Sequence, residues 1–368
     1  ARFLPGIEEV AVMMGTDNNK EMMREVGFSG PEINAVTPRD IVICLRGEDG
    51  QTVETALSEI EGMLTRRSRP EELQDIYKTL ESVMRERPET NLAIISVPGP
   101  FAAREARKAL KHGLNVLLFS DNVPIEDEIE IKQLAFQMDR IVMGPDCGTA
   151  IINHIPLAFA NVVSPGPIGV VSASGTGLQE VVCLIDSLDS GISQAIGTGG
   201  RDLSDRVGGL AMLKGIDLLE EDDETMVILL ISKPPGPLTT QKILKRISKS
   251  KKKVVINFLG SDPTLISPSG AIAARTLEEA AFSAVAVSRG ETYEARDFTI
   301  PRAEMERILY AETRGMSPEQ KFIRGLYSGG TLCDEAMLIL EDAVDAVYSN
   351  IPLRTGLRVP DLLKGYRH

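Results

Sequence analysis

One stretch, residues 167–202, constrains the fold more than any other part of the chain. Residues 167–173 are a short apolar run rich in β-branched side chains, which is typical of a buried strand. A glycine-rich turn follows, and apolar residues at spacings of three and four then predict an amphipathic helix that ends at Gly191. Residues 192–196 predict a second strand, which runs into another glycine-rich turn. A strand, a helix and a strand of these lengths form one right-handed parallel unit.

Both glycine-rich turns should lie at the carboxyl edge of this sheet, where open α/β sheets bind their ligands. The first turn opens a helix, whose free N–H groups and positive dipole end favour an anion. Arg201 adds a cationic guanidinium beside the second turn. The alternative is that both are tight turns with no ligand, since such motifs also have structural roles. We predict a phosphate site formed by Ser174, Gly175, Thr176, Gly177, Gly197, Gly199 and Gly200.

Charge and composition exclude several classes of function. The 368 residues carry a net charge of −13 and the pI is about 4.9, which argues against nucleic acid as the main partner. No apolar run approaches the roughly 18 residues of a membrane helix, and no signal peptide is visible. The four cysteines form no close pair and the three histidines form no cluster. We therefore expect a cytoplasmic protein with reduced thiols, no membrane contact and no metal site.

The alternation of strand and helix patterns predicts an α/β fold with doubly wound parallel sheets. Residues 1–150 form the first predicted domain, with its first two strands at residues 9–14 and 40–45. A connector at residues 151–166 leads into a second domain at 165–290. Residues 291–320 are charged and predict a linker with one helix.

Residues 321–368 repeat the strand, glycine turn and helix pattern of the second domain. Residues 322–327 predict a strand, residues 328–331 open a helix that runs to about Asp342, and residues 346–348 predict another strand. About fifty residues are too few to close an α/β domain. We expect the start of a third domain that is either truncated or completed by another chain.

Several phrases of the sequence resemble the α subunit of succinyl-CoA synthetase and its acyl-CoA synthetase relatives. Over about residues 90–290 these include VPGPFAAREARKAL, GPDCGTA, GPIGVVSASGTGLQEV and GISQAIGTGGRDL, in the same order and spacing. The phrases SDNVPIEDEI, GTGGRDLS, ISKPP and RGLYSGGTLCDE extend the similarity to the FdrA-type proteins over nearly the whole chain. The resemblance implies a Rossmann-like, CoA-binding-type first domain followed by flavodoxin-like domains.

Three positions depart from the synthetase pattern. The synthetases carry a phosphorylated histidine in a His-Ala-Gly-Ala-Ile loop, and the matching stretch here begins with Pro268. Lys233 stands where they have the glutamate that holds this histidine, and Arg201 stands where they have an aspartate. The resemblance therefore implies that the phosphohistidine relay is lost and that the phosphate pocket is more cationic. Lys233 and Arg201 are the predicted catalytic residues.

The resemblance to FdrA-type proteins also implies a reaction. These proteins are associated with anaerobic purine and allantoin breakdown, as one subunit of an oxamate carbamoyltransferase that works with other subunits. The implied reaction converts oxalurate and phosphate to oxamate and carbamoyl phosphate. An acyl-CoA synthetase of altered mechanism, and a non-catalytic scaffold or sensor subunit in an oligomer, are the alternatives.

The first domain carries a second, weaker candidate site. The synthetases bind CoA at a glycine-rich turn after their first strand, and the matching turn here offers Gly15, Thr16 and Asn18 to CoA or a nucleotide. Asp17 at the start of the following helix would oppose a pyrophosphate. Its alternative role is to cap that helix.

Overall fold

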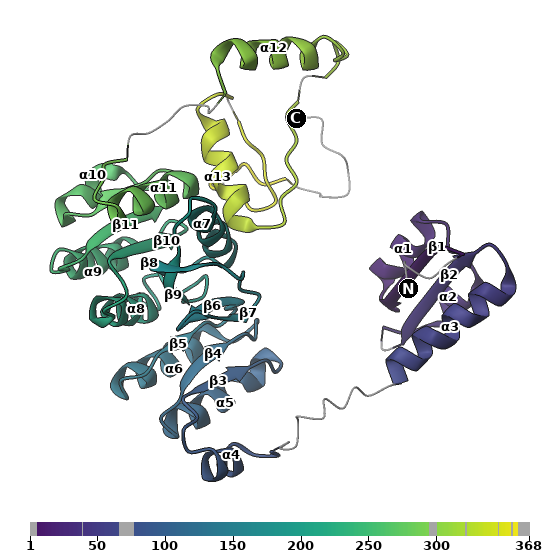
Figure 1. Ribbon diagram of the computed structural model, residues 1–368, viewed down its shortest axis with the longest axis horizontal. Helices are drawn as coiled ribbons and strands as arrows, with labels where there is room; N and C mark the ends of the chain where they lie inside the picture. Colours follow the sequence, from purple (N-terminus) through teal and green to yellow (C-terminus); the bar gives the residue numbers. More distant parts are fainter. Residues whose placement is uncertain are drawn as a thin grey trace. The chain divides into compact units, whose positions relative to one another are not determined.

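The computed structural model describes residues 6–38, 40–65, 77–293, 300–320, 322–344, 346–354 and 356–359. Figure 1 shows its helices and strands. The chain divides into two compact units, Ala1–Lys78 and Thr79–His368.

The first unit contains a two-stranded antiparallel sheet with Ala11 opposite Cys44. Its small core joins Ala11 and Val42 of the sheet to Met23 and Ile33 of two helices. The elements are β1 (Ile7–Met14), α1 (Asp17–Glu25), α2 (Pro31–Ala35), β2 (Ile41–Gly47) and α3 (Gly50–Thr65).

The pairing of β1 with β2 differs from our expectation of one parallel sheet over residues 1–150. Both strands form close to the predicted positions, but they pair with each other, and the unit ends at Lys78. The physical reason lies in their side chains: most residues of β1 and β2 are only half-buried. A parallel strand covered on both faces would instead be apolar along its whole length.

The second unit begins with a three-stranded parallel sheet in the order β3-β4-β5. Alanines line the buried face of helix α5 and let it approach the sheet closely. The elements are α4 (Leu80–Glu86), β3 (Leu92–Ile95), α5 (Gly99–Lys111), β4 (Asn115–Leu118), α6 (Ile125–Gln137) and β5 (Val142–Met143).

A seven-stranded sheet follows, in the order β12-β11-β10-β8-β9-β6-β7. The first five strands in this order are parallel, and β6 runs antiparallel to both of its neighbours, β9 and β7. The strands are β6 (Thr149–Ile152), β7 (Ile155–Ala158), β8 (Pro165–Ser172), β9 (Ile192–Gly197), β10 (Val227–Ser232), β11 (Lys253–Phe258) and β12 (Ile272–Ala273).

Helices cover both faces of this sheet (Figure 1). Residues of α8 and α9 share one buried cluster with the sheet, and residues of α7 and α11 share another. The remaining elements here are α7 (Gly175–Ser187), α8 (Leu210–Glu221), α9 (Pro237–Ile247), α10 (Pro263–Ile266), a 3-10 turn (Ser267–Ser269) and α11 (Leu277–Ser288). The predicted α/β class is confirmed, and the predicted strand, helix and strand over residues 167–202 form β8, α7 and β9.

The connector that we expected at residues 151–166 instead contributes most of a β-hairpin. Strands β6 and β7 are joined by Asn153 and His154, whose φ angles are 49° and 64°. Two consecutive residues with positive φ form the tight turn that matches the twist of a hairpin. Asparagine adopts this conformation readily, but the sequence lacks the glycine that usually marks such a turn.

The C-terminal region contains α12 (Arg302–Thr313) and α13 (Gly330–Glu341), so both predicted helices form. The strands that we predicted at residues 322–327 and 346–348 do not form. Strands need hydrogen-bonding partners, and the side chains at residues 322–327 are exposed, with Leu326 fully so. Helix α13 does find a partner, because it packs against α7.

Candidate functional site

The first glycine-rich turn opens helix α7 as expected. The Ser174 hydroxyl caps the helix by accepting a hydrogen bond from the Gly177 N–H at 2.9 Å. A Cβ atom on Gly177 would lie 2.8 Å from that hydroxyl, so only glycine fits there. A Cβ atom on Gly175 would meet nothing within 4 Å. As the first N–H groups of the helix, those of Gly175 and Thr176 have no backbone partner within it.

The N-terminal turn of α13 lies directly beside that of α7. The Thr331 hydroxyl is 2.5 Å from the Ser174 hydroxyl, and both side chains are buried. A Cβ atom on Gly329 would lie 2.7 Å from the Thr176 methyl group. Two positive helix ends thus meet at one point. Sequence reasoning did not place Thr331 in this site, although the repeated strand, glycine turn and helix pattern was a signal for it.

Lys233 completes this cluster from the next strand of the sheet. It follows β10 at the carboxyl edge, and its Nζ atom lies 2.7 Å from the Asp334 carboxylate on α13. A Cβ atom on Gly330 would lie 3.1 Å from the same Nζ. The Lys233 side chain is 38% exposed and the Asp334 side chain 5% exposed. The lysine therefore adjoins the helix N-terminus, but its charge already has a partner.

The second glycine-rich turn lies on the same edge of the sheet. The Thr198 N–H donates to the Ser172 carbonyl at 2.8 Å, and a Cβ atom on Gly200 would be 3.9 Å from the Ala173 carbonyl. Gly199 has a φ of 86° and packs against the Pro145 carbonyl. Close packing therefore accounts for Gly199.

Gly197, the first residue of that turn, is equally crowded. A Cβ atom on Gly197 would lie 2.6 Å from the Cys147 sulfur and 2.5 Å from the Thr149 carbonyl. Burial raises the pKa of the Cys147 thiol to about 11, so this thiol stays protonated and has a packing role.

Arg201, whose side chain is 45% exposed, contacts a buried group of charges that joins the second turn to helix α6. Its guanidinium donates to the Val123 carbonyl at 2.8 Å and pairs with the Glu128 carboxylate at 2.9 Å. Glu128 also accepts from Lys132 at 2.8 Å, and Lys132 donates to Asp202 at 2.8 Å. Glu128, Lys132 and Asp202 are nearly inaccessible to solvent. The contacts of Arg201 thus tie it to α6.

The third set of predicted residues, Gly15, Thr16 and Asn18, lies in the first unit, where the sheet is antiparallel. The Thr16 hydroxyl caps α1 by accepting from the Asn19 N–H at 3.4 Å, so the cap is Thr16, where we had considered Asp17. A Cβ atom on Gly15 would lie 2.5 Å from the Thr37 carbonyl. The Asn18 side chain lies outside the described residues.

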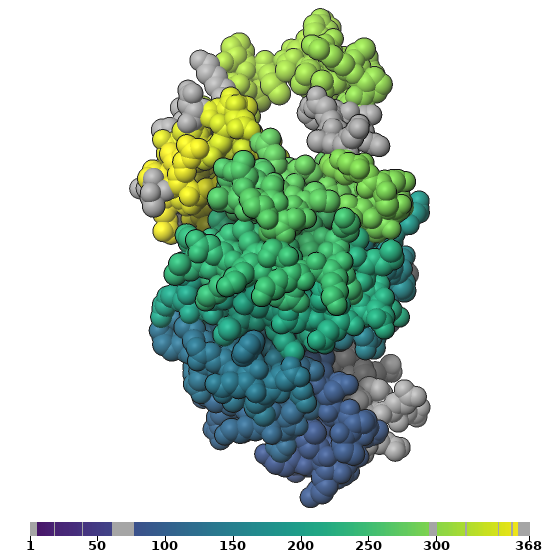
Figure 2. Space-filling model, turned by 90° about the vertical axis from the view of Figure 1, so that its left-hand side faces the viewer, coloured from purple at the N-terminus to yellow at the C-terminus, as the bar shows by residue number. Residues whose placement is uncertain are grey.

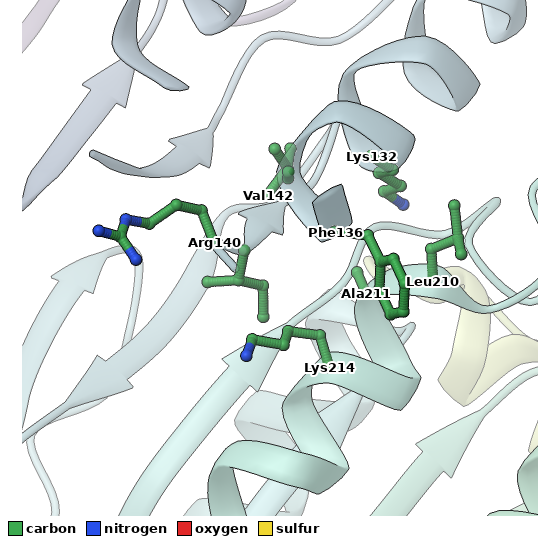
Figure 3. A pocket seen from close by; sticks show the side chains of 9 residues that line it. Lys132, Phe136, Arg140, Val142, Leu210, Ala211 and Lys214 are labelled. Atoms are coloured by element: carbon green, nitrogen blue, oxygen red, sulfur yellow. The ribbon is translucent and has the colours of Figure 1, made fainter. Parts of the chain in front are cut away.

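A small pocket lies between α6 and α8, away from the glycine-rich turns (Figure 3). Its volume is about 10 Å³, which is close to the space that one water molecule needs. It is therefore a packing gap between helices and is too small for a substrate. The residues that line it are Lys132, Ala135, Phe136, Arg140, Ile141, Val142, Leu210, Ala211 and Lys214.

Two known protein families match parts of the chain. The family described as "AllF, heavy metal-associated domain" matches residues 1–79, and the family described as "CoA binding domain" matches residues 163–260. The CoA-binding match thus covers β8, α7 and the strands that follow. We had expected the CoA site within residues 1–150.

The first unit offers a soft metal ion one thiol, together with the thioether sulfur atoms of its methionines. Such ions favour several sulfur ligands, and residues 1–79 contain one cysteine, Cys44. Its thiol lies 3.6 Å from the Met23 sulfur, and burial raises its pKa. In the described part of the chain, no cluster of three or more histidine, cysteine or carboxylate side chains could hold a metal ion.

Among the residues that the structure describes, no helix is both long enough and apolar enough to cross a bilayer.

Curated relatives fall into two groups. "Uncharacterized protein YahF" of Escherichia coli is 44% identical over 369 residues, which cover 100% of this chain and 71% of that protein. The succinate–CoA ligase [ADP-forming] subunit alpha of Methanothermobacter thermautotrophicus is 31% identical over 165 residues, which cover 44% of this chain and 55% of that subunit. The matched region is thus only about half of that ligase subunit.

A solved structure supports the fold. ATP citrate lyase from Methanothrix soehngenii, in complex with citrate and coenzyme A, matches with a TM-score of 0.51 and 20% identity. The match covers 72% of this chain and 51% of that chain.

Proposed function

The chain belongs to the same protein family as YahF of Escherichia coli, and from this premise we propose that its second unit is an acyl-CoA synthetase-like module that binds a phosphate or acyl phosphate. One observation carries the proposal: the N-terminal turn of α7 and Lys233 follow the adjacent parallel strands β8 and β10 at the carboxyl edge of the sheet. The helix end offers free N–H donors and about half a positive charge. A phosphoryl group is the kind of ligand that such a site recognises.

The α7 turn and Lys233 would have different roles in binding the phosphoryl group and in acyl transfer. The N–H groups of Gly175 and Thr176 would hold phosphoryl oxygens, and the Lys233 ammonium would neutralise them. Negative charge grows on the phosphate as an acyl group leaves it, and donors that are already in place stabilise that change. We assign the contact with the anion to Lys233, because it follows β10 beside the end of β8. We assign the support of the second turn to Arg201, because it contacts the Val123 carbonyl and the Glu128 carboxylate.

Coenzyme A fits the same part of the fold only through its phosphate groups. The CoA-binding family match includes the α7 turn, whose N–H groups suit a phosphate. When bound, CoA would supply the thiol that accepts the acyl group. In that role this chain would orient the phosphate and keep Lys233 beside it.

A phosphohistidine is not part of the proposal. The loop at residues 268–272 carries Pro268 where the resembling synthetases have histidine. The His154 ring bonds to the carbonyl of Ile192 and to the carboxylate of Glu224. Ile192 is the first residue of β9, so His154 lies at the amino edge of the sheet, opposite to the α7 turn.

Carbamoyl transfer is the second candidate function, and the same substitution favours it. A carbamoyl phosphate needs a phosphate cradle but no histidine, and oxamate would bring a carboxylate for a cation such as Lys233. The phosphorolysis of oxalurate to oxamate and carbamoyl phosphate would satisfy these requirements. Partner subunits, which the resemblance implies, belong to this candidate.

Calorimetric titration with acetyl phosphate, carbamoyl phosphate and CoA tests both candidates. We expect an acyl phosphate to bind to the wild-type protein and to bind roughly tenfold more weakly to Lys233→Met, because a charge-assisted contact is lost. Binding of CoA as well would favour the ligase, and binding of carbamoyl phosphate alone would favour carbamoyl transfer. Lys245→Met removes an exposed lysine near the end of α9 and serves as the control. No heat with any of the three ligands would leave only a scaffold role.

A further inference from the structure

We propose that α13 is an autoinhibitory helix, in which the Asp334 carboxylate takes the place of a ligand anion on Lys233. This inference rests on the proposed function, because it concerns the control of the same anion site. A phosphate-bearing ligand must displace Asp334 before it can use the lysine.

Three polar contacts hold α13 at the carboxyl edge of the sheet. The Thr331 hydroxyl meets Ser174, the Asp334 carboxylate meets Lys233, and the Glu335 carboxylate accepts from the Leu277 N–H at 2.6 Å. These partners belong to α7, to the segment after β10 and to α11. Figure 2 shows the C-terminal residues, in yellow, lying against the green surface of this unit. The docked helix therefore covers the edge at which a ligand would enter.

The charges of α13 oppose an anion at this site. Docking brings about half a positive unit from the helix N-terminus, but Asp334 adds a full negative charge 2.7 Å from the Lys233 ammonium. The net effect of docking is to lower the positive charge around Lys233. A phosphate that took the lysine for itself would leave Asp334 buried and unpaired, which is strongly unfavourable. Ligand binding at Lys233 and docking of Asp334 therefore compete.

The segment that leads to α13 has few contacts that would hold the helix on the sheet. No residue of α12 is buried, and the ion pairs of Arg302 with Glu306 and of Arg307 with Glu304 are internal to the helix. The buried apolar contacts of α13 are few, with Met337 at 4% exposure. Helix α13 can thus leave the sheet without breaking a large apolar core.

Competition of this kind has a thermodynamic consequence. A ligand that prefers the undocked state shifts the population toward it, and a change that favours undocking raises the affinity for the ligand by the same coupling. Removing the charge of Asp334 should therefore strengthen the binding of an anion.

The test compares Asp334→Asn with the wild-type protein in calorimetric titrations with inorganic phosphate. We expect the variant to bind phosphate roughly tenfold more tightly, which is within the usual range of such couplings. Hydrogen exchange of residues 330–341 in the wild-type protein should become faster when phosphate is added. Asp342→Asn is the matched control on the same helix, because Asp342 pairs with Arg275 at 3.7 Å and both side chains are exposed. It should leave the phosphate affinity within a factor of two.

The outcomes separate this inference from the function on which it rests. Phosphate binding that Lys233→Met weakens roughly tenfold but Asp334→Asn leaves unchanged or weakens would overturn the autoinhibitory role and keep the anion site. No phosphate binding by any variant, Asp334→Asn included, would overturn both.

Discussion

At the scale of single residues, Lys132 is the side chain on which the junction between the two sheets depends. Its ammonium donates to Glu128, to Asp202 and to the Thr198 carbonyl at 2.8 to 3.0 Å, and it is buried. Lys132→Met would leave two carboxylates buried with less compensation. We expect the free energy of unfolding in urea to fall by about 3–5 kcal/mol, as for other buried pairs that lose one partner.

A surface ion pair provides the control for this prediction. Arg206 pairs with Glu126 at 2.7 Å, and both side chains are largely exposed. Arg206→Met should change the free energy of unfolding by less than about 1 kcal/mol. Equal small losses in both variants would show that the buried charges around Lys132 do not stabilise the junction.

At the same scale, some residues of the candidate site could be placed from the sequence, but their contacts with distant residues could not. Ser174 and Gly177 could be placed correctly, because a serine cap and a glycine at a helix start are local features. The pair between Lys233 and Asp334 could not be placed, because its partners are 101 positions apart and their meeting depends on how α13 packs. For the same reason Arg201 could be located beside the second turn, but its pairing with Glu128 could not.

At the scale of elements, the docking of α13 should depend on pH through Glu335. Burial raises the pKa of the Glu335 carboxyl above 4.5, and the nearby Glu180 and Glu278 raise it further, although the Leu277 N–H opposes them. A raised carboxyl pKa means that the docked state holds the proton more tightly than the undocked state. The contribution of Glu335 to docking is therefore fully present below its ordinary pKa and is lost as the pH rises through the raised pKa.

Hydrogen exchange of α13 at several pH values, corrected for the intrinsic pH dependence of exchange, measures this effect. The protection of residues 330–341 should decrease as the pH rises, and Glu335→Gln should remove most of that dependence. A pH dependence that stays the same in Glu335→Gln would show that another group controls docking.

Helices and strands could be predicted from the sequence where neighbouring residues determine them. They could not be predicted where they depend on pairing with a distant strand. The helix of α7 has a cap, an apolar stripe and a clear end, and it forms as predicted. The segment at residues 322–327 is apolar enough for a strand, but it has no neighbouring strand with which to pair. The hairpin of β6 and β7 was missed because Asn153 and His154 are unusual turn residues.

At the scale of the whole molecule, the order of strands and helices predicted the α/β class but not the division of the chain. The boundary lies at Lys78, where we expected one domain to reach residue 150. Strand pairing decides this boundary, and a sequence pattern gives strand positions without giving their partners. The CoA-binding family match falls on residues 163–260, which contain the parallel strands β8, β9, β10 and β11.

A crystal structure of the protein grown in phosphate tests the central claim most directly. We predict a tetrahedral anion within hydrogen-bonding distance of the Thr176 N–H and the Lys233 ammonium, with Asp334 moved away from the lysine. A structure that keeps the pair of Lys233 and Asp334 and holds no anion at the α7 turn would contradict the claim.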